Sequence, residues 1–576
     1  MAHVFDIVIR NGTLVDGSGG PPRKADVAIA DGKIAKIGMV AEKGAEEIDA
    51  TGKLVTPGFV DIHTHYDGQV TWENTLKPSS NHGVTTVVTG NCGVGFAPCK
   101  PEQRDTLVRV MEGVEDVPEI VMTEGLPWNW ETFPEYLDSL SQREYDIDFA
   151  TQIPHSAIRV YVMGERGEHR EPATEQELRQ MREIVREAIQ AGAVGVSSSH
   201  HLGHRTVAGE LAPSVGSASE EVLSLARGLR DAGAGVFQMI TDGFYGGSDA
   251  RAQMDLLRSI AQASGRPVSY SLVQKPPYIR LHEDMLELTK EVQAQGLPIK
   301  AQIFPRPVGL LFGLTLSFHP FRFHPSYLAI HDLPLAQRVA EMRKPEVRAA
   351  ILSEKPVHSN PVFLNIVSGY DNAFLLGDPP NYEPSPEDLL HVQAKRKGVS
   401  VAELAYDLLL EDDGNAAIMN PSSNFMEGNF NAIQKMLMDE NTLIALGDGG
   451  AHYGMICDSS YPTTVLTHWV RDRKGERLPL EQAIQRLSRN NALAVGLSDR
   501  GLVAEGYKAD INIIDFDRLQ LHPPQPVYDL PGGGRRIMQK SEGYVATIVS
   551  GRITYKDGVP TGTRPGRLVR RSQSVA

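Results

Sequence analysis

The stretch from Val55 to Gly68, VTPGFVDIHTHYDG, decides the fold, because it joins an apolar run of strand length to two histidines one residue apart, His63 and His65. Residues two apart in a strand face the same side, so both imidazoles point the same way. In a parallel barrel this strand end would lie at the face that carries the active site. The pair is then either a metal clamp or two polar residues where a strand meets water.

Composition indicates a globular chain that handles small molecules. The chain has 576 residues, which is more than the usual domain of about 100–200 residues. Apolar residues make up 41% and charged residues 22% of it, as is typical of globular proteins. The 57 basic residues against 72 acidic ones give a net charge of −15, which repels phosphate backbones. Nucleic acid and anionic membrane are therefore not expected as partners, whereas a small-molecule substrate is.

Cysteine content and hydropathy predict a cytoplasmic protein. Cys92, Cys99 and Cys457 are too few for a disulfide framework and ordinary for a reducing compartment. The N-terminus enters a strand pattern without a basic region or a long apolar run, and a segment of about 18 apolar residues does not occur.

The middle of the chain alternates apolar strand-length runs with amphipathic helical segments such as 174–192, which is typical of βα units and a parallel sheet. Eight strands are predicted, at 58–65, 84–92, 148–156, 193–199, 235–241, 267–273, 299–304 and 442–450. The fold class is therefore α/β, with a TIM-like (β/α)8 barrel.

Both chain ends consist of short alternating strands separated by Asn-Gly and Asp-Gly turns. We expect residues 1–57 and 500–576 to form one small β-sandwich domain and residues 58–499 to form the barrel. The span 305–440, before the last strand, is too long for a loop and predicts an inserted subdomain. Its aromatic run, 309–331, is either the subdomain core or a lid over an apolar acyl chain.

A closed barrel would bring two further metal-binding side chains to the histidines. Strand 8 neighbours strand 1 and ends at Asp448 of LIALGDGGAH, and strand 2, on the other side, ends at Cys92 of VTTVVTGNC. Two imidazoles, a carboxylate and a thiolate suit Zn²⁺, which lowers the pKa of bound water toward about 7. The alternative for Cys92 is a small buried side chain.

The motifs KLVTPGFVDIHTHYDG, HGVTTVVTGNCGVG and GDGGAH, with IPHSAIRVYVMG and GGGRRIMQ, resemble the amidohydrolase superfamily and within it the D-aminoacylase family. The resemblance runs over nearly the whole chain. It implies a metal-dependent barrel with a small β-domain and a zinc ion among His63, His65, Cys92 and Asp448. The implied activity is hydrolysis of a C–N amide bond in an N-acyl-D-amino acid by metal-activated water.

The sequence departs from that family where a second metal would bind. Members carry a histidine on strands 5 and 6, but these strands read GVFQMITDG and PVSYSLVQ, and strand 4 lacks the lysine that bridges two metals in other amidohydrolases. One zinc ion is therefore expected, and a second is doubtful. Side chains that could substitute, or contact substrate, are Gln238, Asp242, His200, His201 and His204; the alternative for the HHLGH histidines is a polar loop.

Catalytic roles follow from the same positions. Asp448 is expected to take a proton from water and deliver it to the departing nitrogen. His155, at the end of strand 3, is expected to stabilise the oxyanion or hold the acyl group, unless it is a satisfied hydrogen-bonding histidine.

Recognition of the substrate carboxylate is less clear from the sequence. The family's HPR-like stretch after the strand-8 aspartate is absent. His452 follows that aspartate and is a candidate substrate contact. The arginine fork would come from Arg306, Arg471 or Arg159, unless these are surface or helix-end charges.

Two other functions fit the sequence. One is hydrolysis of a cyclic amide, an imide, or a xenobiotic amide or carbamate, since a polarised carbonyl serves all of them. The other is a catalytically silent barrel kept as a scaffold, which the missing strand-5 and strand-6 histidines would permit. A homo-oligomer is compatible with either.

Overall fold

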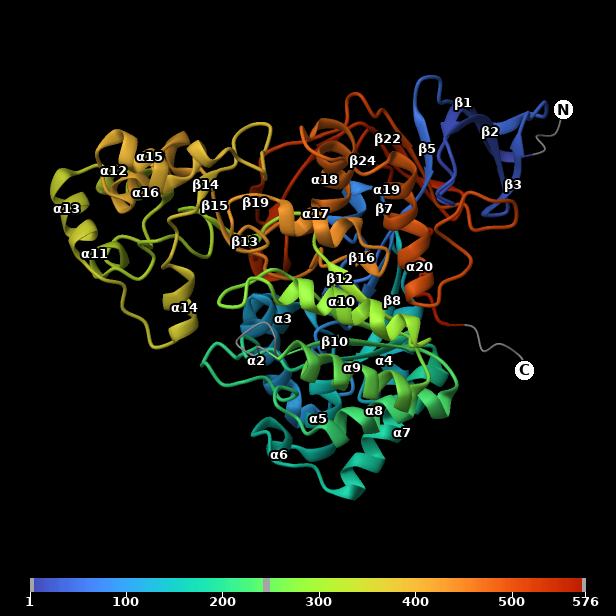
Figure 1. Ribbon diagram of the computed structural model, residues 1–576, viewed down its shortest axis with the longest axis horizontal. Helices are drawn as coiled ribbons and strands as arrows, with labels where there is room; N and C mark the ends of the chain where they lie inside the picture. The colour runs from blue at the N-terminus through green and yellow to red at the C-terminus, as the bar shows by residue number, and fades with distance from the viewer. Residues whose placement is uncertain (1–4, 242–248, 572–576) are drawn as a thin grey trace.

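Eight parallel strands, in the hydrogen-bonded order β16-β12-β11-β10-β9-β8-β7-β6, form the centre of the molecule (Figure 1). The computed structural model describes residues 5–241 and 249–571. Each strand lies within a predicted one, which confirms the barrel. The strands are β6 (Phe59–Asp61), β7 (Val84–Thr89), β8 (Asp148–Pro154), β9 (Gly195–Ser199), β10 (Val236–Ile240), β11 (Val268–Ser271), β12 (Ile299–Ile303) and β16 (Thr442–Ile444).

Amphipathic helices connect these strands, and α7 shows why they form where they do. Thr174 caps its N-terminus in a capping box with Glu177, and Gly192, at φ +119°, ends it in a left-handed conformation that glycine adopts without strain. The main helices between β7 and β16 are α2 (Arg104–Glu115), α3 (Glu119–Gly125), α4 (Phe133–Ser141), α5 (His155–Met163), α7 (Glu175–Ala191), α8 (Ser219–Ala232), α9 (Ala250–Ser264), α10 (Leu281–Ala294) and α17 (Asn431–Met438).

The two chain ends pair in one nine-stranded sheet, as expected. Strand β5 (Leu54–Pro57) is parallel to β1 (Phe5–Leu14) and antiparallel to β17 (Ile511–Ile514). The other strands of this sheet are β2 (Arg23–Ala30), β3 (Lys33–Gly38), β4 (Gly44–Asp49), β22 (Tyr544–Val549), β23 (Arg552–Lys556) and β24 (Val559–Pro560). The domain boundaries at 57/58 and 499/500 stay predictions.

Gly58 alone separates β5 from β6, so the terminal sheet leads directly into the strand that carries the histidines. A Cβ atom at this position would lie 2.2 Å from Oγ1 of Thr85 on the neighbouring strand. Only glycine therefore allows the chain to pass from the sheet into the barrel here.

The segment between β12 and β16 forms a lobe beside the barrel (Figure 1). It contains a three-stranded sheet, β13 (Val308–Phe312), β15 (Ile418–Ser423) and β14 (Phe374–Leu375), and its own apolar cluster. The aromatic run at 309–331 supplies much of that cluster, namely Phe312, Phe318, Phe321, Phe323 and Tyr327. The lobe also contains α11 (Pro325–Leu328), α12 (Leu335–Met342), α13 (Pro345–Ser353), α14 (Pro361–Ile366), α15 (Leu390–Lys397) and α16 (Val401–Leu409).

Side-chain and backbone hydrogen bonds join the first and last barrel strands. The Asn491 amide, at the start of α20 (Asn491–Ala494), donates to the carbonyls of Val60 in β6 and Ile444 in β16, both at 2.8 Å. Beyond the strand ends, Asp448 N donates to His63 O at 3.2 Å and His65 N to Gly449 O at 2.7 Å. These contacts bring the predicted histidines and aspartate together. No helix in the described part of the chain is long and apolar enough to cross a membrane.

We expect Asn491→Ala to lower the free energy of unfolding by about 2–4 kcal/mol, because two buried carbonyls lose their hydrogen-bond donor. Urea denaturation followed by circular dichroism measures this. The exposed Asn415→Ala variant is the control and should change stability by less than about 0.5 kcal/mol. Equal midpoints for the two variants would show that Asn491 does not hold the seam.

Candidate functional site

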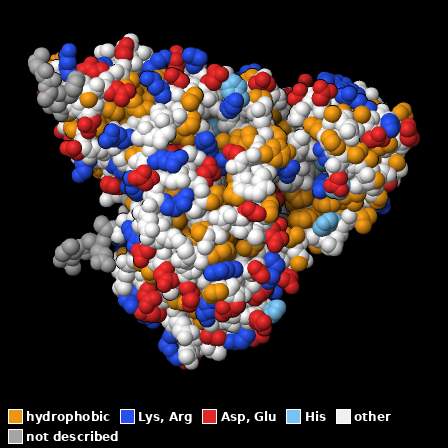
Figure 2. Space-filling model, turned by 180° about the vertical axis from the view of Figure 1, so that it is seen from behind, with side chains coloured by type: hydrophobic (Ala, Val, Ile, Leu, Met, Phe, Trp, Pro, Cys, Tyr) orange, Lys and Arg blue, Asp and Glu red, His pale blue; other side chains and the backbone are white. Residues whose placement is uncertain are grey.

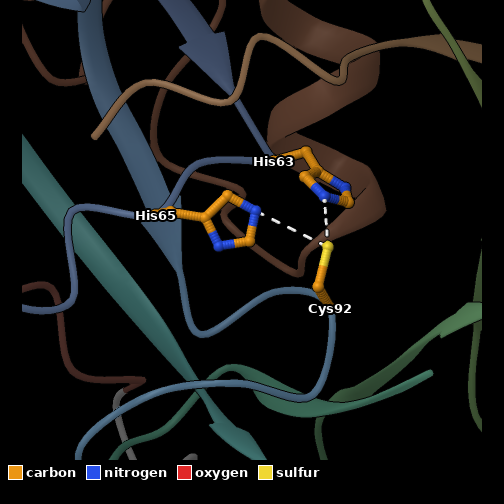
Figure 3. A group of neighbouring side chains, drawn as sticks. All are labelled: His63, His65 and Cys92. Carbon is orange, nitrogen blue, oxygen red and sulfur yellow. Dashed lines mark hydrogen bonds between the residues drawn. The ribbon is translucent and has the colours of Figure 1, made fainter. Parts of the chain in front are cut away.

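Three metal-binding side chains meet at the carboxyl ends of β6 and β7 (Figure 3). Cys92 Sγ lies 3.2 Å from His63 Nε2 and 3.5 Å from His65 Nε2. Asp448 Oδ1, which comes from the segment after β16, lies 3.7 Å and 3.8 Å from the same two nitrogens. The four predicted ligands are therefore brought to one point.

Each histidine has a polar side chain beside its other ring nitrogen, hydrogen-bonded in the case of His63 and at a longer distance in the case of His65. Gln302 Oε1 lies 2.7 Å from His63 Nδ1, and the same amide donates to Ser269 Oγ. Glu115 Oε1 lies 3.5 Å from Nδ1 of His65. Oxygen acceptors beside both Nδ1 atoms favour a proton there and leave the Nε2 lone pairs for an ion, as in many carboxylate–histidine–metal arrangements.

Backbone conformation places the other two ligands. Cys92 and Asp448 adopt left-handed φ values of 56° and 45°, which are uncommon outside glycine. The Cys92 amide donates to Gln238 Oε1 at 3.1 Å. The glutamine of strand 5 therefore stabilises the backbone conformation of the residue that carries the thiol. Such backbone conformations persist only where surrounding contacts maintain them.

Asp448 is the most exposed of the four predicted ligands. Its side chain is 24% exposed, whereas those of His63 and His65 are each 1% exposed. A carboxylate at the boundary between buried ligands and solvent can exchange protons with a bound water molecule.

Burial shifts the pKa of every group in this cluster in the direction that favours the neutral form of that group. It lowers the pKa of His63 to about 4 and the pKa of His65 well below its usual value. It raises the pKa of the Cys92 thiol, helped by nearby Glu115, and the pKa of Asp448, helped by Asp458. A divalent cation would favour the thiolate and the carboxylate instead, so its binding would release protons.

The donor set fits one metal ion. Two imidazole nitrogens, a sulfur and a carboxylate oxygen converge, and both imidazoles are held with Nε2 inward. His65 Nδ1 and Glu115 Oε1 are buried and lack a short hydrogen bond among the described residues, although they lie side by side. His63, His65, Cys92 and Asp448 would hold the ion, with Gln302 and Glu115 behind them.

The loop after β9 brings further histidines to the mouth of the barrel. The rings of His201 and His204 lie 4.7 Å apart. Burial, together with nearby His452, His63 and Lys275, lowers the pKa of His204 to about 3. His452 Nε2 lies 3.5 Å from Glu115 Oε2. These predicted substrate contacts therefore adjoin the metal-binding cluster.

Lys275, which follows β11, is a cation that the sequence analysis missed. Burial lowers its pKa to about 8, and its charge acts on His201 and His204. A lysine just beyond the end of a barrel strand, in SLVQK, was the available signal.

His155 does not face the cluster with a free nitrogen. Its Nδ1 lies 2.8 Å from Ser198 Oγ and its Nε2 lies 2.9 Å from Glu221 Oε1, and the side chain is fully buried. Glu221 also pairs with Arg159. The arrangement corresponds to the hydrogen-bonding alternative, and it leaves neither His155 nor Arg159 available to a substrate.

Arg306 is likewise paired with an acidic side chain inside the protein. It is 1% exposed, lies 2.8 Å from Asp458 Oδ1, and stacks 4.2 Å over the Tyr382 ring. Arg471 pairs with Asp472 and donates to Leu519 O. Neither guanidinium is positioned as a fork for a substrate carboxylate, because each already has oxygen partners.

Two further expected residues lie elsewhere. His200 Nε2 lies 3.1 Å from Ser217 Oγ rather than facing the metal-binding cluster. Asp242 lies outside the described residues.

Glu115 and Gln302, which orient the two ligand histidines, were not identified from the sequence. Glu115 ends α2, a helix whose buried residues include Val108, Met111 and Val114. An acidic residue four positions after Met111, on that buried face, was the signal. Gln302 is the buried polar residue of the strand IKAQI, in which Lys300 is only half-buried.

The comparisons place the whole chain among known hydrolases. Residues 46–555 match the amidohydrolase family. A D-aminoacylase from Alcaligenes xylosoxydans xylosoxydans is 26% identical, covering 99% of this chain and 98% of its own length. An N-acyl-D-aspartate deacylase from the same organism is 25% identical, at 98% and 95% coverage.

A solved structure has the same fold. The N-acyl-D-glutamate deacylase from Bordetella bronchiseptica, complexed with zinc and a phosphonate inhibitor, superposes with a TM-score of 0.65 at 21% identity, covering 98% of this chain and 100% of that one. With a family match over 46–555 and metal-binding side chains converging at the strand ends, this chain belongs to the amidohydrolase family.

Proposed function

We propose that this protein hydrolyses N-acyl-D-amino acids to a carboxylic acid and a free D-amino acid, using one zinc ion held by His63, His65, Cys92 and Asp448. The observation that carries the proposal is the convergence of these four side chains with only Asp448 substantially open to solvent. Full-length similarity to enzymes named for N-acyl-D-amino acids supports the substrate class.

The reaction needs one group that both takes and gives a proton. When bound, zinc would supply a Lewis acid that polarises the amide carbonyl and acidifies water. Asp448, as carboxylate, accepts the proton of the attacking water and delivers it to the departing nitrogen. Glu115 and Gln302 keep the ligand imidazoles in one orientation while charge develops beside them.

Residues at the mouth of the barrel would bind the carboxylate of the substrate. Lys275 places positive charge near His201 and His204, next to the cluster, and would attract a substrate carboxylate there. At pH 7 a lysine with a pKa of about 8 is mostly protonated, and an arriving carboxylate would stabilise that charge further.

Single-metal occupancy follows from the residues at the ends of strands 5 and 6. Gln238 Oε1 accepts the Cys92 amide, and Ser271 lies on strand 6. Neither supplies an imidazole, so a second ion would have few ligands besides the shared thiolate. Cytoplasmic location and a homo-oligomeric state stay predictions from the sequence.

The substrate class is tested by a screen of N-acyl-D- and N-acyl-L-amino acids, with cyclic imides as a third group, on zinc-loaded protein. We expect turnover of the D-series with a free amine as product. Hydrolysis confined to the imides, or to L-substrates, would replace the proposed substrate. Inactivity toward all three groups in protein holding zinc would contradict it.

We expect purified protein to hold one divalent ion per chain, because His63, His65 and Cys92 converge with Asp448 beside the two histidines, and strands 5 and 6 add no imidazole. Inductively coupled plasma mass spectrometry measures the stoichiometry. His63→Ala should lower it, whereas the matched His391→Ala, at an exposed position, should not. Two ions at full occupancy would show that other side chains replace the missing histidines.

Asp448→Asn should keep the fold and lose about 100-fold to 10,000-fold in kcat, because an amide cannot take up and return the proton. Steady-state kinetics and circular dichroism measure the two effects. Asp413→Asn, at a side chain 93% exposed, is the charge-matched control. A loss of only a few fold would exclude Asp448 as the base.

Cys92→Ala should weaken zinc binding by roughly 10-fold or more if the thiolate is a ligand. A cysteine that only packs would lose about 1 kcal/mol of stability and keep its metal. Competition with a fluorescent chelator measures zinc affinity, and the buried Cys99→Ala variant is the control. Unchanged affinity in Cys92→Ala would leave the metal to two histidines, one aspartate and solvent.

A further inference from the structure

A cleft lies between the inserted lobe and the C-terminal segment, and it is distinct from the metal-binding cluster. Its volume is about 430 Å³, and a hollow separates the lobe from the body of the molecule in Figure 2. The lining residues fall into three groups: the cationic Arg322, Arg338 and Arg535; the polar Thr315, Ser317 and His331; and the apolar or aromatic Leu314, Leu316, Leu335, Tyr327 and Tyr528.

None of the three arginines forms an ion pair with an acidic side chain among the described residues, although burial raises the pKa of Asp116 and the charge of Arg535 partly opposes that rise. Arg535 donates to Thr315 O at 2.6 Å and Ser317 Oγ at 3.0 Å, and Arg338 donates to His331 O at 2.9 Å. These acceptors are neutral. The Nε atoms of Arg338 and Arg535 are buried and lack a hydrogen-bond partner among the described residues.

Several arginines near the cleft or on the same lobe do lie beside acidic side chains. Arg536, adjacent to Arg535, lies 2.8 Å from Asp529 and 3.4 Å from Glu73. Arg343 and Arg348, elsewhere on the lobe, lie 3.7 Å from Asp413 and 3.2 Å from Asp407. In a chain with 72 acidic residues, three guanidiniums without such a partner in one cleft mark a local site of positive potential.

The positive potential also affects the pKa values of neighbouring side chains. Burial lowers the pKa of His319 well below its usual value, and the charges of Arg322 and Arg338 lower it further. Burial raises the pKa of Tyr327, and the same two arginines oppose that shift. The arginine charges therefore act on the same part of the lobe.

We propose that this cleft binds a small organic anion whose phosphate or carboxylate is held by Arg322 and Arg338 of the lobe and Arg535 of the C-terminal segment. Guanidinium groups bind both kinds of oxyanion through paired N–H donors. Tyr327, Tyr528 and the leucines would cover an apolar portion. The cleft volume lies within the range of small-molecule sites.

A bound anion would connect parts of the chain that also border the metal-binding cluster. Ser317 N donates to Gly454 O at 2.9 Å, and Gly454 N donates to Asp116 Oδ2 at 3.2 Å. Asp116 follows Glu115, which faces His65. The anion would thus hold the lobe against the C-terminal segment, and Ser317 of the lobe contacts the segment after β16. This binding site does not depend on the proposed function.

The test is isothermal titration calorimetry of the full-length, metal-loaded protein with phenyl phosphate, phenylacetate and, as the neutral analogue, 2-phenylethanol. We expect at least one anion to bind and the alcohol not to. The anion that binds more tightly shows whether phosphate or carboxylate is preferred. Binding of neither anion, or equal binding of the alcohol, would overturn the proposal.

Variants then assign the site. R322Q/R338Q should weaken anion binding by about 10-fold or more, since it removes two of the three guanidinium groups that would bind the oxyanion. The control R343Q/R348Q removes two arginines of the same lobe that already face acids, and it should bind as the unaltered protein does. Unchanged binding by R322Q/R338Q, with circular dichroism showing a folded protein, would place the anion elsewhere.

A measurement on the unaltered chain covers the case in which the variant misfolds. Phenylglyoxal modifies accessible arginines, and mass spectrometry locates the products. The tighter-binding anion should slow modification of Arg322 and Arg338 but not of Arg343. Equal modification rates with and without the anion would contradict the proposal.

Discussion

The metal-binding cluster depends on one constraint: the first and last barrel strands must end at the same place. Asp448 N donates to His63 O, and His65 N donates to Gly449 O, so the backbone itself joins the two segments. Asn491 holds the same strands together lower in the barrel. Without this seam, histidines and aspartate from opposite ends of the sequence would have no fixed distance.

Once the first and last strands are joined, the charge states of the clustered side chains determine which ligand they can bind. Neutral imidazoles, a thiol and carboxyls are packed where burial disfavours charge. A cation reverses that preference, because it stabilises thiolate and carboxylate while it accepts the imidazole lone pairs. Glu115 and Gln302 add directional contacts to the two rings, so the chain determines ligand orientation as well as ligand identity.

Local patterns predicted the barrel strands and picked out side chains that the fold brings close together, because strand periodicity and strand ends can be recognised in consecutive residues. Once the order of the barrel strands was assumed, the strand ends in VTPGFVDIHTH and LIALGDGG could be predicted to lie side by side. Glu115 could not be placed that way, since it lies on a helix whose packing against the strand-8 segment is a tertiary property. His155 and Arg306 looked suitable by position, yet Glu221 and Asp458 partner them inside the protein.

The continuity of β5 and β6 through Gly58 has a consequence for synthesis of the chain. Strand β5 lies between β1 and β17, so its neighbour β17 leaves the ribosome long after β1 and β5 do. The N-terminal strands must wait for that neighbour with an exposed edge, a state in which chains tend to aggregate. Shortening the C-terminus before β17 would therefore affect the segment that leads into His63 and His65, although it removes neither residue.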